Sequence, residues 1–309
     1  MNSSTNSSRV LLILFSCLGP GVALACSCGC GVFDVGTDSM FPAGAGTMLF
    51  AEYDFMNQNE NWHGTSRAPS GDNGDKRIST DFMNIGVQHM FNPSWGLTLE
   101  LPYWDRYFKT TDEDTGELAS YTHSALGDIR IKGTYSGFAR DMSTGVTFGV
   151  KLPTGDSNYS GFDPDTEIGS GSTDLLLGAY HRGPLTEDGG WNWLVNGQWQ
   201  QPIAHKNSYR PGAEVDTSVG LSYRGWSFGS AGSIAPLLQF KGVYRDNDGG
   251  SKSDPDNSGY KRVLLNPGLQ VDAGNVSVHM DVGIPLYTDT KGNQLVAPSL
   301  WKLNVGYHF

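Results

Sequence analysis

The chain has 309 residues, 38% of them hydrophobic, with 41 glycines and a mean hydropathy of −0.34. Its formal charge of −11 at neutral pH argues against a nucleic-acid partner, because phosphate binding needs clustered Lys and Arg side chains. The four cysteines are too few, and too unevenly placed, for a fold built on disulfides.

The first 25 residues have the features of a secretory signal peptide. Arg9 precedes an apolar run from Val10 to Leu18, which is too short to cross a bilayer as a helix. Ala23-Leu24-Ala25 then forms an A-x-A cleavage site. We expect residues 1–25 to be removed, which takes away one Arg and no acid and leaves a mature charge of −12.

Three cysteines follow the predicted cleavage site at every second position, in the segment CSCGCGVFDVG. In an extended chain, Cys26, Cys28 and Cys30 would point to one side, an arrangement that suits a soft metal ion such as Cu(I), or Zn(II) with a fourth ligand. The alternatives are a disulfide between two of the thiols, or lipidation of Cys26, although the residues before it match a lipobox poorly.

From residue 46 onward, apolar and polar residues alternate with a period of two, and no segment is typical of a helix. The C-terminal segment SLWKLNVGYHF shows this most clearly, because its aromatic and branched residues share one face while Lys302, Asn304 and His308 lie on the other. We predict strands at about 46–56, 79–91, 95–109, 125–138, 144–154, 172–182, 191–203, 213–226, 230–245, 261–273, 275–288 and 298–309.

The connections between these strands alternate in length. Short turns alternate with long polar loops at 57–78, 110–124, 155–171, 204–212, 246–260 and 289–297. An even strand number, aromatic strand ends and this alternation are typical of bacterial outer-membrane barrels, whereas a β-sandwich does not explain the loop lengths. We therefore predict an all-β fold, a transmembrane antiparallel up-and-down barrel of about twelve strands over residues 46–309. Residues 26–45 precede it as a candidate periplasmic plug.

The alternation also predicts which charged side chains point inward, where they would line a polar pore and form cross-strand ion pairs. These candidate pore-lining residues are Glu52, Glu100, Asp128, Arg130, Lys132, Lys151, Asp174, Arg182, Asp216, Arg224, Lys241, Arg245, His279, Asp281 and Lys302.

No catalytic motif stands out. The chain lacks a G-x-S-x-G elbow and an H-E-x-x-H pair, and we expect His123-Ser124 to lie in a flexible loop without an orienting partner. The acidic loops do not match a calcium loop; we expect them to be solvated turns, with divalent bridges to lipopolysaccharide phosphates as the alternative. The terminal aromatic Phe309 resembles the signal read by the outer-membrane assembly machinery.

Four segments resemble the outer-membrane channel family named for the MetA pathway of phenol degradation. They are NPSWGLTLELPY at 92–103, ALGDIRIKGTY at 125–135, VTFGVKLPTGDS at 146–157 and GSGSTDLLLGAY at 169–180. The resemblance implies a barrel that moves hydrophobic or aromatic compounds across the outer membrane.

We therefore expect an outer-membrane channel for small molecules rather than an enzyme. The alternative is a barrel scaffold that engages a periplasmic redox or metal-handling partner through the N-terminal cysteines. An outer-membrane barrel enzyme is a more distant alternative.

Overall fold

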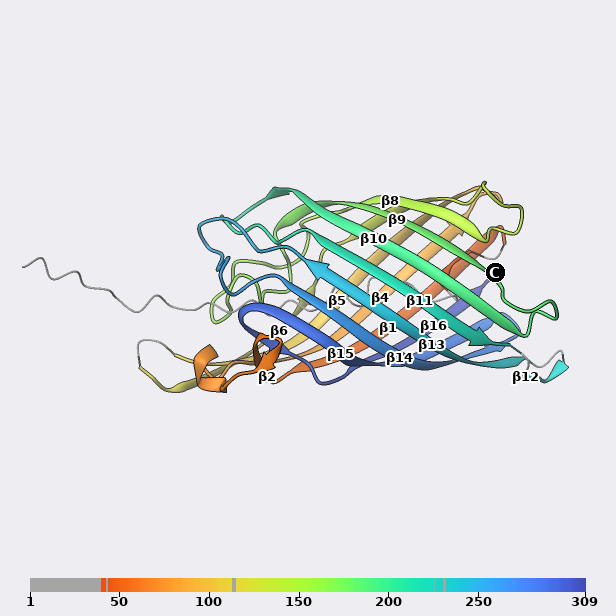
Figure 1. The fold of residues 1–309 in the computed structure, drawn as a ribbon. Helices are drawn as coiled ribbons and strands as arrows, with labels where there is room; N and C mark the ends of the chain where they lie inside the picture. The colour runs from red at the N-terminus through yellow and green to blue at the C-terminus, as the bar shows by residue number, and fades with distance from the viewer. Residues whose placement is uncertain (1–39, 43, 113–114, 225, 230–231) are drawn as a thin grey trace, which may run out of the picture.

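The computed structural model describes residues 40–309, apart from residues 43, 113–114, 225 and 230–231. Twelve antiparallel strands form a closed barrel (Figure 1), and one of the twelve is divided into two segments, β6 and β7. The barrel strands are β1 (Gly46–Gln58), β4 (Arg77–Met90), β5 (Trp95–Thr111), β6 (Leu118–Leu126), β7 (Arg130–Tyr135), β8 (Thr144–Lys151), β9 (Ser172–Pro184), β10 (Trp191–His205), β11 (Glu214–Tyr223), β13 (Ser233–Arg245), β14 (Tyr260–Ala273), β15 (Val276–Val296) and β16 (Leu300–His308).

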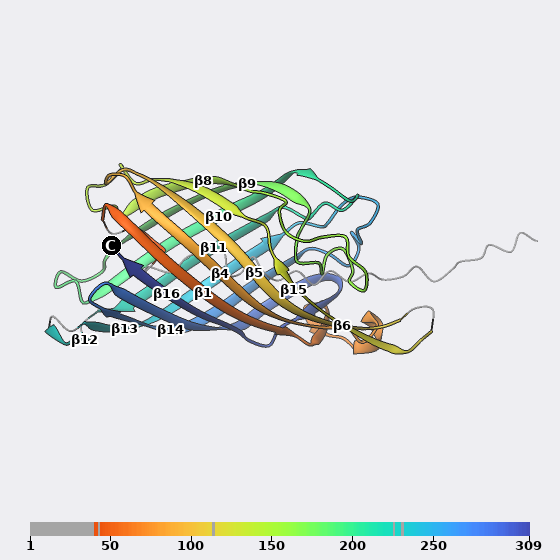
Figure 2. The same cartoon turned by 180° about the vertical axis from the view of Figure 1, so that it is seen from behind.

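The barrel closes where the first strand pairs with the last. β1 and β16 are antiparallel neighbours from Met48↔His308 to Met56↔Leu300, and Phe309 continues the contact through its N–H, which donates to the Thr47 carbonyl at 2.8 Å. Both ends of the described chain therefore lie at the end of the barrel that carries the short turns (Figure 2). The predicted fold class, a twelve-stranded up-and-down barrel, is confirmed.

The sequence alternation appears in the structure as two faces of one sheet. In β16, Lys302 and Asn304 are buried inside the barrel, whereas Trp301, Leu303 and Val305 are exposed on the outside. Along β5 the outward side chains run from Trp95 through three leucines to Tyr103. Aromatic residues on either side of an aliphatic band are the pattern of a lipid-facing barrel wall.

Long connections lie at the opposite end and carry structure of their own. The first contains β2 (Glu60–Gly64), β3 (Ser66–Arg67) and the 3-10 turn η3 (Ser70–Asn73). The predicted loop 289–297 is wrong for most of its length, because β15 continues to Val296 and pairs with β2. β12 (Trp226–Ser227) is a short hairpin arm at the short-turn end.

The continuous strand predicted at 125–138 is also wrong. The ladder stops at 127–129 and β7 begins at Arg130, so Asp128 lies in the break rather than in a strand. Its carboxylate accepts hydrogen bonds from the backbone N–H groups of Gly155 and Ser170 in the following long loop, both at 2.9 Å. A charged side chain that binds backbone donors competes with the regular ladder, which accounts for the interruption.

The predicted signal peptide and Cys26, Cys28 and Cys30 lie outside the described residues. Among the residues that the structure does describe, no three His, Cys, Asp or Glu side chains are placed to hold a metal ion. Across the same residues there is no helix long and apolar enough to span a bilayer.

One close contact inside the barrel gives a test of the register. Gly86 of β4 lies directly opposite Phe50 of β1, and a Cβ atom at Gly86 would overlap the Phe50 ring. We expect Gly86→Val to lower the free energy of unfolding by about 1–3 kcal/mol through overpacking, measured by urea unfolding in detergent micelles. Gly183→Val in β9 is the control, because a Cβ atom there meets Trp193 at an ordinary 3.5 Å. Equal effects of the two substitutions would contradict this register.

Candidate functional site

A buried ion cluster crosses the seam between β1 and β16. The Lys302 ammonium lies 2.7 Å from the Glu52 carboxylate and 3.8 Å from that of Asp54, and all three side chains are almost fully enclosed. The register explains the arrangement, because Asp54 is the direct cross-strand partner of Lys302 and Glu52 is one inward step away.

The cluster continues around the wall on β15, β14 and β13. Asp281, opposite Lys302 in the ladder, accepts hydrogen bonds from Asn266 at 2.6 Å and pairs with His279 at 2.9 Å. The Lys241 ammonium lies 3.8 Å from the same carboxylate. Five neighbouring strands thus contribute to one polar layer, which fills this side of the bore with side chains.

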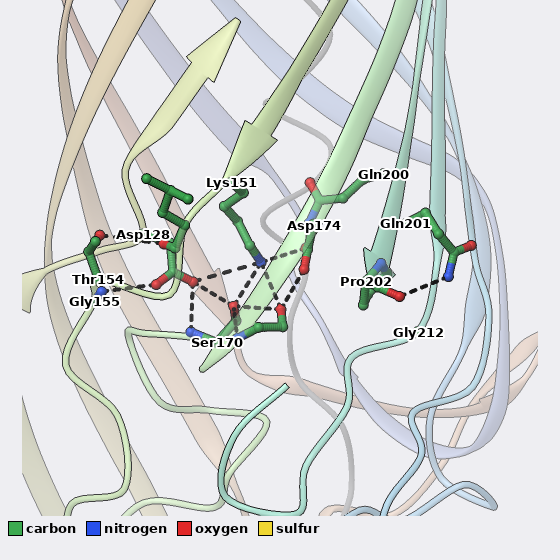
Figure 3. A network of polar contacts seen from close by, with 12 residues as sticks. Asp128, Lys151, Thr154, Gly155, Ser170, Asp174, Gln200, Gln201, Pro202 and Gly212 are labelled. Carbon is green, nitrogen blue, oxygen red and sulfur yellow. Dashed lines mark hydrogen bonds and ion pairs between the residues drawn. The ribbon is translucent and has the colours of Figure 1, made fainter. Parts of the chain in front are cut away.

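A second network holds the opposite wall (Figure 3). Lys151 of β8 lies 2.7 Å from Asp174 of β9 and 3.7 Å from Asp128, and it donates to the Ser170 hydroxyl at 2.7 Å. Gln200 of β10 donates to the same Asp174 oxygen that Lys151 contacts, at 2.6 Å. Because Asp128 and Ser170 belong to the break and the long loop, this network ties that loop to the wall.

The loop between β8 and β9, residues 152–171, folds into the barrel rather than away from it. Asp163 in this loop forms an ion pair with Lys76 at 2.6 Å, and Lys76 is buried. Arg106 of β5, also buried, donates to the carbonyls of Thr166 and Glu167 at 2.5 and 3.3 Å. Lys76 immediately precedes β4 and Arg106 lies on β5, so the inward loop reaches past β7 to the β4–β5 part of the wall.

The interior also contains a layer of apolar side chains, which the sequence analysis of inward charged residues does not predict. Its buried members come from β1, β4, β13, β14 and the start of β16, and Trp104 of β5 packs against them. They are Met56, Phe82, Val243, Tyr260, Leu264, Ala297 and Leu300. Phe82 meets Trp104 edge to face, with ring centroids 4.8 Å apart. The expectation of a polar-lined interior is therefore incomplete.

The described residues enclose a series of cavities along the barrel. A mouth cavity of about 380 Å³ lies among the long loops, and it shares Tyr209 with a middle cavity of about 120 Å³. The middle cavity shares Glu100 with a third of about 80 Å³, which in turn shares Phe41 with a cavity of about 340 Å³ at the short-turn end. The narrow part of the bore is thus its middle.

The lining of the middle cavity combines a few apolar side chains with many charged ones. Phe82, Trp104 and Ile168 line it together with Asp128 and Lys151. The apolar residues belong to the interior apolar layer or to the inward loop, and the charged ones belong to the network of Figure 3. An amphipathic wall of this kind suits a small molecule with an apolar body and a polar group.

Aromatic side chains of the inward loop line the mouth. Tyr159 stacks on His123 of β6 with ring centroids 3.9 Å apart, and burial raises the pKa of Tyr159 to about 12. Phe162 lies 5.5 Å from Phe108, between ring centroids. Burial also raises the pKa of Glu167, against the opposing effect of backbone N–H groups that donate to its carboxylate.

The expectation for His123-Ser124 is wrong, because both residues lie on β6 rather than in a flexible loop. His123 is oriented by Asp156 at 2.8 Å on the inner side, while the Ser124 hydroxyl donates to Asp105 on the outer side at 2.8 Å. Adjacent residues of a strand point to opposite faces, so the two side chains do not form a nucleophile–base pair.

Three residues before β1 reach into the short-turn end. Phe41 stacks on Tyr180 with ring centroids 4.3 Å apart, and Arg182 donates to the Pro42 carbonyl at 2.8 Å. Gln88 donates to the Met40 carbonyl at 3.4 Å. Met40 and Phe41 thereby separate two of the cavities. Residues 26–39 and 43 of the candidate plug lie outside the described residues.

The fifteen candidate pore-lining residues differ in their surroundings. Arg130, Lys132 and Arg182 are partly buried, and Arg224 is exposed just beyond the end of β11, beside the short-turn cavity. The remaining eleven are buried: Glu52, Glu100, Asp128, Lys151, Asp174, Asp216, Lys241, Arg245, His279, Asp281 and Lys302. That they line a conducting pore stays a prediction.

Several buried charges were missed at the sequence level. Arg106, Arg262 and Glu214 face inward by the same alternation that identified their neighbours, and applying it to every position would have found them. Lys76 and Asp248 lie outside the predicted strands, so no periodicity could indicate them.

No family model and no curated protein matches the chain. Among solved structures, an outer-membrane channel of the COG4313 group from Pseudomonas putida F1 is similar over 89% of this chain and 100% of that chain, with a TM-score of 0.66 and 13% identity. The β-domain of the Bordetella autotransporter BrkA is similar over 86% of this chain and all of that one, with a TM-score of 0.53 and 11% identity.

These similarities show the fold. The chain is a barrel of the Gram-negative outer membrane. In such barrels the short turns face the periplasm and the long loops face the outside of the cell. The mouth cavity and the inward loop therefore lie on the extracellular side.

The ion cluster at the seam gives a second prediction. Lys302→Met leaves the carboxylates of Glu52 and Asp54 enclosed without their main counter-ion, so we expect a loss of about 3 kcal/mol in the free energy of unfolding, measured by urea unfolding in micelles. Lys291→Met is the control, because its pair with Asp256 is exposed and such pairs contribute about 0–1 kcal/mol. A loss at Lys302 no larger than at Lys291 would show that lumen water compensates the carboxylates.

Proposed function

We propose that the barrel is an outer-membrane channel for small hydrophobic molecules, aromatic ones in particular. The observation that carries the proposal is the interior apolar layer beside the narrow middle cavity, formed around Phe82, Trp104 and Leu264. A channel for hydrated solutes gains nothing from apolar side chains along a constricted part of its bore, since they only weaken contact with water.

The size of the middle cavity supports the same conclusion. A dry protein cavity of about 150 Å³ is known to bind benzene, and water takes about 30 Å³ in the liquid. A volume of about 120 Å³ therefore suits one small ring better than a hydrated sugar. The amphipathic lining would hold the apolar body against Trp104 and leave a hydroxyl or similar group near Lys151.

The comparisons support a channel in general. The Pseudomonas putida protein is described as an outer-membrane channel. The sequence segments that resemble the phenol-degradation family imply hydrophobic or aromatic cargo. The ion networks fit this function too, because inward side chains that pair between neighbouring strands fill part of the bore and narrow it against large hydrophilic solutes.

Release of the inward loop should open the bore. Asp128→Ala removes the acceptor of the Gly155 and Ser170 N–H groups and one partner of Lys151, so we expect a severalfold higher single-channel conductance in planar bilayers. Asp156→Ala is the control, because it removes a contact of the same loop that is exposed and lies at the mouth. Equal conductance of the two variants would mean that the loop does not limit the bore.

Entry of a single-ring hydrophobic molecule tests the proposal itself. We expect cells that produce the protein to take up radiolabelled toluene faster than cells without it, and Trp104→Asp to lower this rate by about tenfold, equivalent to about 1.4 kcal/mol. Trp62→Asp, on β2 beyond the barrel wall, should leave the rate unchanged. A channel that instead admits arabinose readily in liposome swelling and does not accelerate toluene entry would overturn the proposal.

A further inference from the structure

Two cations face each other on the outside of the barrel. Arg77 of β4 and Lys109 of β5 are direct cross-strand partners at the extracellular end of these strands. Their strand neighbours Ile78 and Phe108 are buried inside, so Arg77 and Lys109 point outward. Directly opposed residues have Cβ atoms about 5 Å apart, and like charges in this arrangement repel.

Nothing in the described chain neutralises this pair. Arg77 donates one hydrogen bond, to the Asn57 amide oxygen at 3.1 Å, and neither cation forms an ion pair with a described residue. The nearest outward carboxylates on the same two strands are Asp81 and Asp105, four residues further down the wall, about 13 Å along the strands. Tyr53 donates to Asp81, and Ser124 donates to Asp105.

The position of the pair indicates what could neutralise it. The outward side chains of β5 pass from the leucine band through Tyr103, Asp105 and Tyr107 to Lys109. Tyrosines at the end of a lipid-facing band mark the membrane–water interface. Arg77 and Lys109 therefore lie just beyond the acyl chains of the outer leaflet, at the level of anionic headgroups.

Hydrogen-bonding side chains surround the two cations. Ser120 of β6 is the cross-strand partner of Lys109, and Ser79 lies one outward step below Arg77. A guanidinium, an ammonium and nearby hydroxyls form a donor set that matches the oxygens of a phosphate group. Because the chain is negatively charged overall, it does not attract anions nonspecifically, and anion binding at Arg77 and Lys109 would depend on this local donor set.

We propose that Arg77 and Lys109 bind a phosphate group of lipopolysaccharide on the outer face of the barrel. The ligand supplies the negative charge that the two strands lack, and the barrel thereby gains a fixed glycolipid beside the β4–β5 hairpin. This site lies on the wall outside the bore, so it does not depend on the proposed channel function.

Native mass spectrometry of the full, detergent-folded chain tests the site. Titration uses deep-rough lipopolysaccharide, the same lipid after enzymatic removal of phosphate, and inorganic phosphate. We expect the wild type to bind the phosphorylated lipid at least about tenfold more tightly than the variant Arg77→Gln/Lys109→Gln, because the variant loses the charge-assisted hydrogen bonds of both cations. The dephosphorylated lipid should bind the wild type as weakly as the phosphorylated lipid binds the variant.

Lys261→Gln is the matched control, because this outward cation at the same end of the barrel already faces Asp289 in the ladder. It should keep wild-type affinity, and the heat-dependent gel shift of folded barrels should be the same for all three proteins. Equal binding by the double variant, or equal binding of the dephosphorylated lipid, would overturn the proposal. Competition by inorganic phosphate at the concentration of the lipid would assign the pair to free phosphate instead.

Discussion

Closure of the sheet between β1 and β16 is the constraint on which the rest of the structure depends. Once these strands pair, every residue of the wall faces either lipid or an enclosed bore, and the choice follows from its parity along the strand. Charges on inward positions then have no bulk solvent to face. Lys302 and Asp281 show the consequence, because Lys302 is buried beside Glu52 of the neighbouring β1 and Asp281 is buried near Lys241 of β13, two strands away.

The inward loop converts this wall into a narrow bore. Two sets of contacts hold it: Asp128 and Lys151 hold its two ends, while Lys76 and Arg106 hold its centre from the β4–β5 part of the wall. Apolar residues of the loop and the wall meet between these polar contacts, where Ile168 lines the cavity beside Phe82 and Trp104. The apolar side chains that the loop leaves accessible in the bore would then make the channel selective for apolar cargo.

Much of this fold could be predicted from the sequence, because a barrel wall has one dominant signal. The alternation around Trp301 to Phe309 and the lengths of the connections identify the strands and their number. The exceptions have local causes. The break at Asp128 depends on backbone donors of a loop more than 25 residues away, and the extension of β15 depends on pairing with β2.

The candidate site was less predictable for a related reason. Periodicity assigns a residue to the inside of the barrel but does not tell which inward residues contact one another. Met56, Leu264 and Leu300 come together only because the sheet curves and brings their strands around the same part of the bore. Lys76 and Asp163 lie in connections, where no period applies. Nothing in the sequence alone indicates that the loop between β8 and β9 folds inward.

Occupancy of the middle cavity by an aromatic molecule tests the central claim most directly. Crystals of the full barrel grown with 4-iodophenol would locate the ligand by the anomalous signal of iodine. Passage of small aromatic molecules through the bore predicts an iodine peak between Phe82, Trp104 and Ile168. Iodine peaks confined to the lipid-facing surface, with none inside the barrel, would contradict it.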